Sequence, residues 1–368
     1  MRPAKARPKA HAGKGLIFVT FLLVLAAAAG CGSDADGPRV PVKVMTYNIY
    51  LGSDLTRLVT TTAEGIPKTS AYILNNVMAS NFPERAKVLA TMITTAAPDL
   101  IGLQEVSLYR KQVPSDFAPG ATPNASEVLL DFLEVLMKEI EDRGGHYRVV
   151  NEAINADAEL PVDDGNGELF DLRLTDRDVI LAREGVVASD PMAATFTNRL
   201  MLPVGGPEGV LVDFVRGYST VTATIDGVSF TFGNSHLEVG AVEQIQIEQA
   251  KEVLAGLRSI TGQMILVGDF NSPLVATKTN SYALLTQEFR DAYVEARGRD
   301  PGLTCCQADD LKNPTSQADQ RIDLVLHRGG IRAQDAVVIG TEPSTGKTEA
   351  GQWASDHFGL TATLGLKP

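Results

Sequence analysis

Cysteine is scarce in this sequence, with three residues in a chain of 368. Cys31 lies near the N-terminus, while Cys305 and Cys306 are neighbours. Neighbouring cysteines cannot link distant parts of a fold, so a scaffold held by long-range disulfides is excluded. In an oxidising compartment this pair could close a vicinal disulfide or stay reduced. A redox or metal role and a plain loop role both stay open, because one pair without further Cys or His spacing is a weak signal.

Positively charged residues are also fewer than negatively charged ones. The chain has 33 Lys and Arg residues against 45 Asp and Glu residues, a formal net charge of −12. Residues 1–30 carry five bases and no acids, so the rest of the chain has a formal charge of −17 (−12 − 5). Such a chain has no overall field that gathers polyanions, so nonspecific nucleic-acid binding should be weak. A nuclease is not excluded, because a bound metal ion reverses the local field.

The N-terminal segment has the pattern of an export signal. A basic stretch over 2–14 is followed by an apolar stretch over 15–29, too short and too early to be a spanning helix in its own right. The segment ends in Ala28-Ala29-Gly30-Cys31, which resembles a bacterial lipoprotein signal with Cys31 as the lipidated first residue. Ordinary secretion with cleavage near Ala29 is the alternative. In both cases the mature protein is expected outside the cytoplasm, anchored to the membrane through Cys31 or secreted.

We therefore expect a leader over 1–30, a polar tether over 31–41 and one domain over 42–368. That domain is longer than most, but one large sandwich can reach this length. Aromatic residues make up 6% of the chain and hydrophobic residues 44%, which suits a soluble core. No internal repeat or low-complexity tract stands out.

Apolar runs bounded by turn residues predict strands, and apolar residues at helical spacing predict helices. The expected strands are 43–49, 100–103, 147–151, 178–182, 210–215, 218–225, 228–233, 264–268, 322–327, 336–339 and 358–364. One helix is expected to begin at Pro83 and to end at Pro98. Further helices are expected over 126–142, with Ser126 as the N-cap, over 242–260 and over 282–287. The stretches 51–82 and 106–175 are expected to form long excursions that rim a cleft. Because strands and helices mix without strict βαβ alternation, an α/β (α+β) fold with two packed sheets and outer helices is favoured.

Six short polar fragments each lie at the end of an apolar strand-like stretch. They are Tyr47-Asn48, Gln104-Glu105, Asn234-Ser235-His236, Gly268-Asp269-Phe270-Asn271, Arg321-Ile322-Asp323 and Ser355-Asp356-His357. Rigid scaffolds use such positions for chemistry. Together the fragments offer ligands for a hard cation, a group that activates water and an acid for the leaving group. This combination suits hydrolysis of a phosphoester.

Glu105 is the first metal-ligand candidate, because it emerges where a buried strand meets solvent. Mg²⁺ prefers oxygen ligands and keeps several waters, so one or two protein carboxylates suffice. Asn48 could supply a neutral oxygen or a hydrogen bond in the same region. Taken alone, Asn48 is also typical of a turn, and Glu105 of a solvated strand end.

Two Asn-containing pairs follow apolar strands. Asp269 and Asn271 are two residues apart, so in extended geometry both side chains point to the same side. One would position or deprotonate a water while the other binds phosphate, although an Asx turn explains the same residues. Asn234 and His236 share this spacing. There Asn could orient a nucleophile, and a protonated His could stabilise charge on a phosphoryl oxygen.

His357 is the candidate general acid or base, since imidazole titrates near neutral pH. Such a residue needs a carboxylate that fixes its tautomer, and Asp323 is the candidate. The alternative for Asp323 is a structural ion pair with Arg321. Asp356, beside His357, would reach the metal or a water.

The ordered set of fragments resembles the motifs of the endonuclease/exonuclease/phosphatase superfamily over roughly residues 42–366. This superfamily includes pancreatic-type deoxyribonucleases, abasic-site endonucleases, inositol polyphosphate 5-phosphatases and bacterial sphingomyelinases. Each fragment alone is a weak signal, but six in order are specific. The resemblance implies a four-layer sandwich, in which two mixed β-sheets pack face to face between helices. It also implies phosphoester hydrolysis that depends on Mg²⁺ or another divalent cation.

By motif position, the resemblance implies metal binding by Glu105, Asn48 and Asp356. It implies that Asp269 aligns the water and that the remaining catalytic residues are His357, Asp323, Asn234, His236 and Asn271. The Asn-Ser-His-Leu sequence at 234–237 matches the branch of phosphatases and sphingomyelinases and makes an abasic-site endonuclease less suitable.

The leading hypothesis is an extracytoplasmic, metal-dependent phosphodiesterase or phosphatase. A phospholipid head group fits the predicted anchor, and residues 199–209 could dip into lipid or form an ordinary loop. Nucleic acid and small phosphate esters are the other substrate classes. A nuclease of the same family and a non-catalytic binding lipoprotein are the alternative functions, and no protein partner is predicted.

Overall fold

The structure is a computed structural model that describes residues 37–206, 209–274 and 280–368. The predicted leader, Cys31 and most of the tether lie outside these ranges. Within them, no helix has the length and apolar character needed to cross a membrane. Residues 38–368 form a compact unit.

The larger sheet of the described chain has eight strands. Its order is β15-β16-β1-β2-β6-β3-β4, and β5 pairs with β6. The strands are β1 (Val40–Asn48), β2 (Leu100–Gln104), β3 (Leu108–Gln112), β4 (Glu127–Asp131), β5 (Tyr147–Asp163), β6 (Leu169–Arg183), β15 (Arg332–Ile339) and β16 (Gly359–Leu366). β1 runs parallel to β2 and antiparallel to β16, so the sheet is mixed.

The smaller sheet has six strands in the order β13-β14-β12-β11-β10-β7. They are β7 (Val187–Thr195), β10 (Gly217–Ile225), β11 (Val228–His236), β12 (Met264–Asp269), β13 (Arg290–Asp291) and β14 (Asp323–Arg328). The expected hairpin around Asp226-Gly227 joins β10 and β11. A separate two-stranded ribbon consists of β8 (Leu200–Val204) and β9 (Val210–Phe214), so residues 199–209 contain a strand.

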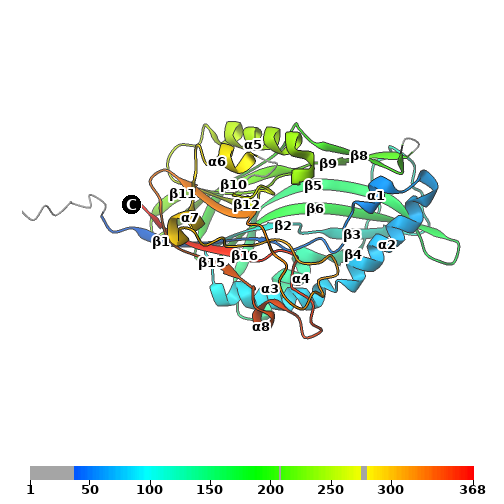
Figure 1. Cartoon of the computed structure of the whole chain (residues 1–368), viewed down its shortest axis with the longest axis horizontal. Coiled ribbons are helices and arrows are strands. Elements are labelled where there is room, and N and C mark those ends of the chain that lie inside the picture. Colours follow the sequence, from blue (N-terminus) through cyan, green and yellow to red (C-terminus); the bar gives the residue numbers. More distant parts are fainter. Residues whose placement is uncertain (1–36, 207–208, 275–279) are drawn as a thin grey trace, which may run out of the picture. The chain divides into compact units, whose positions relative to one another are not determined.

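The two sheets stack, and helices cover both outer faces (Figure 1). α2 (Ile66–Ala79), α3 (Phe82–Ala96) and α4 (Phe132–Asp142) share a buried cluster with the outer face of the larger sheet. α5 (Glu243–Leu257) and α6 (Ser281–Leu285) share one with the smaller sheet. A third buried cluster joins the inner faces of both sheets. The four-layer α/β sandwich expected from the sequence is therefore confirmed.

Two stretches expected as long surface excursions are in fact structured. Within 51–82 the chain forms α1 (Arg57–Thr60) and α2, and α2 buries Ile66, Ile73 and Val77. Within 106–175, where a helix and a strand were already expected, it forms β3, β4, α4, all of β5 and about half of β6. The scattered Thr and Asn residues of α2 hid its apolar stripe, because weak helix formers on an exposed face do not prevent a helix whose other face is buried.

The helix expected over 126–142 is shorter than predicted. Its N-cap is Asp131, whose carboxylate accepts hydrogen bonds from the backbone N–H groups of Leu133 and Glu134. Residues 127–131 instead pair with β3 as β4. Ser126 is therefore not the cap, because pairing along the sheet edge holds the residues that follow it in an extended conformation. The short helices α7 (Ala292–Arg297) and α8 (Pro343–Gly346) and strand β7 were not anticipated.

The sheets approach one another closely at Gly102 of β2. A Cβ atom there would lie 2.5 Å from Val267 Cγ2 and 2.7 Å from Asn234 Oδ1. The Asn234 side chain crosses this gap, donating to the Leu103 carbonyl at 2.9 Å and accepting from Gln104 Nε2 at 2.7 Å. Glycine at residue 102 thus allows a polar link between the two sheets.

Arg85 of α3 connects loops from distant parts of the chain. Its guanidinium is fully buried and donates to the carbonyls of Ile49, Tyr50, Ser80 and Ala354 over 2.8–3.1 Å. Burial lowers its pKa to about 10, so the group is charged at neutral pH. Ile49 and Tyr50 directly follow Asn48, and Ala354 precedes Asp356 and His357 in sequence. One side chain therefore fixes two of the loops that carry predicted site residues.

Replacing Arg85 by Met should lower the free energy of unfolding by about 3–5 kcal/mol, because four buried carbonyls lose their donor. Chemical denaturation measures this change. Lys87→Ala, on the exposed side of the same helix, should leave the denaturation midpoint unchanged. An Arg85→Met protein as stable as wild type would show that these hydrogen bonds contribute nothing net.

Candidate active site

Strand register brings three predicted side chains together in the smaller sheet. Asp269, at the end of β12, lies directly opposite His236 of β11 on one side and Asp323 of β14 on the other. Gly268, just before Asp269, has φ +155°, and a Cβ there would lie 1.9 Å from the Ser235 carbonyl oxygen. Glycine at this position lets β12 reach its end while it stays paired with β11.

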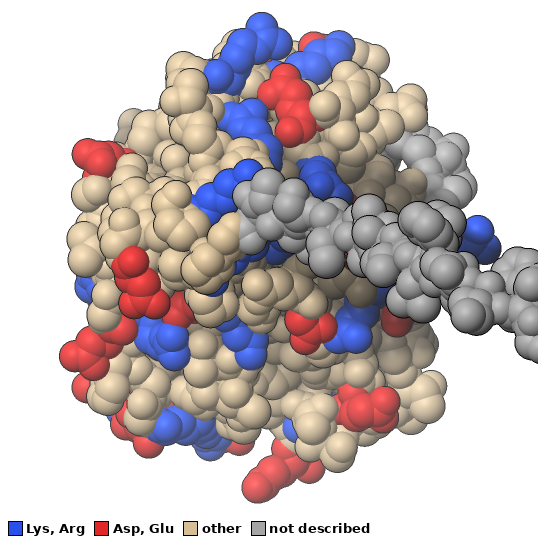
Figure 2. Space-filling view, turned by 90° about the vertical axis from the view of Figure 1, so that its left-hand side faces the viewer, with Lys and Arg blue, Asp and Glu red and all other residues tan. Residues whose placement is uncertain are grey.

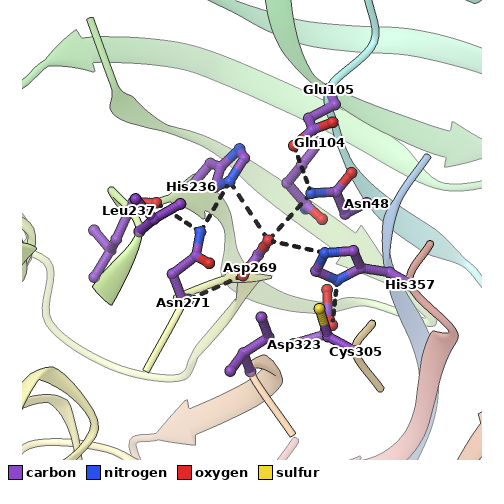
Figure 3. Close-up of polar contacts among 12 residues, drawn as sticks. Asn48, Gln104, Glu105, His236, Leu237, Asp269, Asn271, Cys305, Asp323 and His357 are labelled. Atoms are coloured by element: carbon purple, nitrogen blue, oxygen red, sulfur yellow. Dashed lines mark hydrogen bonds and ion pairs between the residues drawn. The ribbon is translucent and has the colours of Figure 1, made fainter. Parts of the chain in front are cut away.

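The larger sheet contributes Asn48 and Glu105 from the adjacent ends of β1 and β2. Asn48 Nδ2 donates to Glu105 Oε1 at 3.0 Å and to Asp269 Oδ2 at 3.1 Å, so it links carboxylates from both sheets (Figure 3). The second Glu105 oxygen accepts from the backbone N–H of Leu51 at 2.7 Å. Glu105 itself has φ +57°, outside the strand region.

His357 and Asp323 form the expected pair. His357 Nδ1 lies 2.8 Å from Asp323 Oδ2, and both side chains are buried. The other ring nitrogen, Nε2, lies 3.7 Å from Asp269 Oδ2. Asp323 makes no ion pair with Arg321, which instead contacts Asp291 at 2.8 Å. The alternative role for Asp323 is therefore not what the structure shows.

The charge on His357 is set by neighbouring acids. Burial acts to lower its pKa, but the carboxylates of Asp323, Asp269 and Asp356 outweigh burial and raise that pKa well above the usual value. These acids thus favour the imidazolium form of His357. Its Nε2–H points toward Asp269 and can donate a proton to an oxygen that lies between them.

His236 is in the opposite state. Burial, together with the positive charges of Arg216 and His357, lowers its pKa well below the usual value. Arg216 Nη1 lies 2.8 Å from His236 Nδ1, and since a guanidinium can only donate, Nδ1 accepts. The proton of neutral His236 then resides on Nε2, which is 3.5 Å from Asp269 Oδ2. His236 reaches the predicted site, but as a neutral donor rather than the protonated group expected from sequence.

Asp269 and Asn271 are not held in extended geometry. The Asn271 backbone N–H donates to Asp269 Oδ1 at 2.9 Å, and Asn271 has φ +49°, as in an Asx turn. Its side-chain Nδ2 still lies 3.3 Å from His236 Nε2 and donates to the Leu237 carbonyl. The turn and the site are therefore compatible, because the turn places Asn271 beside His236, although two donors face one another there and do not bond.

Asn234 does not join this group. Its side chain is fully buried between the sheets, and its amide is used by Gln104, Leu103 and Val179. Both N–H groups of this amide are used, and its oxygen is buried and accepts from Gln104, so the amide is not presented to a water or a phosphate at the site. The role expected for Asn234 is thus not supported: it lies on the same face of β11 as His236, but two residues before the strand ends, where its amide links the sheets beside Gly102.

Of the two roles expected for Asn48, the structure shows the hydrogen bond rather than the oxygen ligand. Its Oδ1 accepts from the backbone N–H of Tyr50 at 3.0 Å, and this orients the Nδ2 group toward Glu105 and Asp269. In this arrangement Asn48 positions two carboxylates, and the oxygen donors that face the site come from acids.

The carboxylates fit a hard divalent cation. Burial, followed by the charge of Asp323, raises the pKa of Asp269 to about 7 even though His357 is close. Burial, followed by the charge of Glu105, raises the pKa of Asp356 to about 6. These acids lack enough positive charge to stay ionised easily, and a divalent cation with oxygen ligands would supply it. Asp269, Asp323 and His357 also offer ligand atoms within 4.8 Å of one another, and Asp323 and His357 are joined by a hydrogen bond.

Several residues at the site were not singled out from the sequence. Arg216 contacts His236, Asp176 at 3.2 Å and Glu238 at 3.4 Å. Burial raises the pKa of Asp176 to about 6, and burial, followed by the charge of Asp176, raises that of Asp178 well above its usual value. The run Asp176-Arg177-Asp178 entering an apolar strand was the available signal, because charged residues rarely precede a buried strand without a partner.

Fold and site together place the chain among phosphoesterase-like and nuclease-like hydrolases. A protein-family model described as the Endonuclease/Exonuclease/phosphatase family matches residues 45–357. The chain therefore belongs to this family, and the resemblance seen in the sequence motifs is confirmed.

Solved structures share the fold at low identity. A Bacteroides thetaiotaomicron protein of this family is 16% identical with a TM-score of 0.56, over 90% of this chain and all of that one (100%). A mannosyl-6-phosphatase from Bacteroides thetaiotaomicron is 18% identical with a TM-score of 0.52, over 88% and 99% of the two chains. D. rerio TDP2, crystallised with a single-stranded DNA product, is 15% identical with a TM-score of 0.50, over 88% and 98%. No curated protein matches the chain.

Replacing Asp269 by Asn should remove a pH dependence of stability. The pKa of Asp269 rises from 3.8 to about 7 in the folded protein, so folding takes up a proton and metal-free wild type loses stability as pH rises from about 4 to 7. Between pH 5 and pH 8, the free energy of unfolding should fall by about 1–3 kcal/mol more for wild type than for the Asn variant. Chemical denaturation in chelator measures both slopes.

Asp226→Asn, in the exposed β10–β11 turn, is the matched control and should keep the wild-type slope. Parallel curves for Asp269→Asn and wild type would show that Asp269 is ionised in the folded protein throughout this range.

Proposed function

We propose that this protein is a metal-dependent phosphoester hydrolase that uses Asp269 and the Asp323–His357 pair at the chemical step. The observation that carries the proposal is the 2.8 Å contact between His357 and Asp323 beside a buried Asp269. The His357 ring and the Asp269 carboxylate lie 3.7 Å apart. One can donate a proton and the other can accept one, so they can act together on an oxygen atom bound between them.

In this proposal Asp269 accepts the proton of the attacking water. Its raised pKa makes it a better base than an exposed carboxylate, and Asn48 and Asn271 hold it in place through hydrogen bonds. His357 and neutral His236 donate their Nε2–H groups to phosphoryl oxygens, which gain negative charge as the water attacks. Asp323 holds the His357 ring in the orientation that presents Nε2 to the site.

Glu105 and Asp356 would hold the cation, with Mg²⁺ as the proposed ion. When bound, such an ion polarises a phosphoryl oxygen and neutralises developing charge. Asn48 orients Glu105, and the Leu51 N–H fixes the other Glu105 oxygen. Ser355 Oγ lies 3.3 Å from Asp356 Oδ1 and donates to the Asn48 carbonyl, so both ligand-bearing loops are coupled.

For the substrate we propose a phospholipid head group presented outside the cytoplasm. Three features support this class: the export signal ending in Cys31, the Asn-Ser-His-Leu sequence, and the β8–β9 ribbon with Met201 46% and Leu211 65% exposed. On the face shown in Figure 2, Lys and Arg are interspersed with Asp and Glu, and no broad basic surface forms there. A small phosphate ester is the second candidate, because a mannosyl-6-phosphatase shares the fold.

His357→Ala should lower kcat on a chromogenic phosphodiester by about 10³-fold or more with the fold intact, because the imidazolium donor and its orientation are both lost. Initial rates with added Mg²⁺ and with EDTA measure this, with circular dichroism as the check on folding. His146→Ala, an exposed histidine on the β5 side, is the matched control and should retain full activity.

Turnover in EDTA equal to that in Mg²⁺, or full activity of His357→Ala, would refute the proposed roles. Absence of turnover under every condition would favour the binding lipoprotein. Sphingomyelin vesicles, plasmid DNA and mannose 6-phosphate, compared at equal concentration, then separate the substrate classes. Preference for DNA would overturn the phospholipid assignment.

A further inference from the structure

The Cys305–Cys306 pair lies between the two segments that deliver Asp323 and His357. Thr304, just before the pair, accepts from the Asp323 N–H through Oγ1 at 3.3 Å and from the Phe358 N–H through its carbonyl at 2.7 Å. Gln307, just after the pair, donates its N–H to the Asp356 carbonyl at 2.8 Å. The cysteines are therefore held in place by the same backbone that holds the proposed catalytic pair.

Cys305 and His357 face one another directly. They form an isolated antiparallel β-bridge, and side chains opposed in such a bridge project to the same side. Figure 3 shows the Cys305 sulfur beneath the His357 ring, beside Asp323. Both sulfur atoms and a ring nitrogen of His357 lie within 4.8 Å of one another. Cys305 is fully buried, whereas Cys306 is exposed, so the pair can be reached from solvent.

This set of atoms differs chemically from the carboxylate set. Two sulfur atoms and one imidazole nitrogen are ligands for thiophilic cations such as Zn²⁺ and Cd²⁺, whereas Mg²⁺ prefers oxygen. Cys305 and Cys306 are joined as a disulfide in the structure, and in that form the sulfur atoms are not thiolate ligands. The site is thus available only after reduction.

We propose that reduced Cys305 and Cys306, together with His357, form a binding site for a thiophilic divalent cation, distinct from the hard-cation site. Its consequence for catalysis rests on the proposed function: a cation held there occupies His357 and removes it from the reaction. The pair would make hydrolysis sensitive to such cations in a reducing medium and insensitive in an oxidising one.

The chemistry balances with an external dithiol as reductant. The dithiol supplies two electrons and two protons, becomes a disulfide itself, and leaves two thiols in place of the Cys305–Cys306 bond. Cation binding then forms two metal–sulfur bonds and one metal–nitrogen bond. The two thiols each lose one proton to solvent, and the His357 nitrogen that binds the cation carries no proton, so binding should tighten as pH rises.

The test uses the full chain and Cd²⁺ as the probe. One sample is reduced with a dithiol and desalted without oxygen, and its partner sample is left oxidised. We expect the reduced protein to bind one Cd²⁺ per chain with a thiolate-to-metal absorption band, and the oxidised protein to show no such band. In excess Mg²⁺, the reduced protein should then lose activity by about tenfold or more.

Cys306→Ser removes one ligand at an exposed position outside the proposed catalytic machinery. It should keep Mg²⁺-dependent activity, lose the absorption band and bind Cd²⁺ about tenfold more weakly or worse. Alkylation of Cys306 in the reduced wild type should have the same effect. The test therefore does not depend on correct folding of the variant. Glu105→Gln should keep the band, since the hard-cation site is separate.

A band of equal strength in the oxidised protein or in Cys306→Ser would overturn the proposal. So would full activity of the reduced protein with the band developed, because His357 would then not be a ligand. If no hydrolysis occurs under any condition, the proposed function fails, while the absorption band still decides whether this site exists.

Discussion

The buried guanidinium of Arg85 is the interaction on which the arrangement of this site depends. It donates to carbonyls from the loop after β1, from the turn before α3 and from the loop that leads to His357, and also to the Ser80 hydroxyl. Burying a charged group costs free energy unless its N–H groups have hydrogen-bond acceptors. These loops are therefore held where their carbonyls accept from Arg85. This requirement also sets the positions of Asn48 and Asp356, which lie close in sequence to the bonded carbonyls.

A second constraint is electrostatic. The site concentrates carboxylates from both sheets, and each raises the pKa of its neighbours, while His357 and Arg216 supply the nearby positive charge. The two histidines differ for this reason: His357 faces acids and is charged, whereas His236 faces Arg216 and is neutral. A further divalent cation would relieve the excess of negative charge, which agrees with the hard oxygen donors gathered there.

Much of the fold could be predicted, because strands such as 218–225 and 228–233 carry strong local patterns around a turn dipeptide. α2 was missed because its apolar stripe is diluted by Thr and Asn, and only burial against β5 and β6 stabilises it. β4 was taken for the first turns of a helix because its sequence is compatible with both. Sheet-edge pairing, which involves residues far away in the chain, decided between them.

The amino-acid sequence by itself determined which chemical groups end the strands and in what order, since those signals are local: an apolar run, then a carboxylate, carboxamide or imidazole. It could not decide which of these groups face the site and which make other contacts. Tertiary structure placed Asn234 between the sheets, turned the Asn48 amide toward two acids, and brought Arg216 and Cys305 to the two histidines. Charge state and hydrogen-bond direction depend on neighbours from other strands, and only the packed sheets specify which neighbours those are.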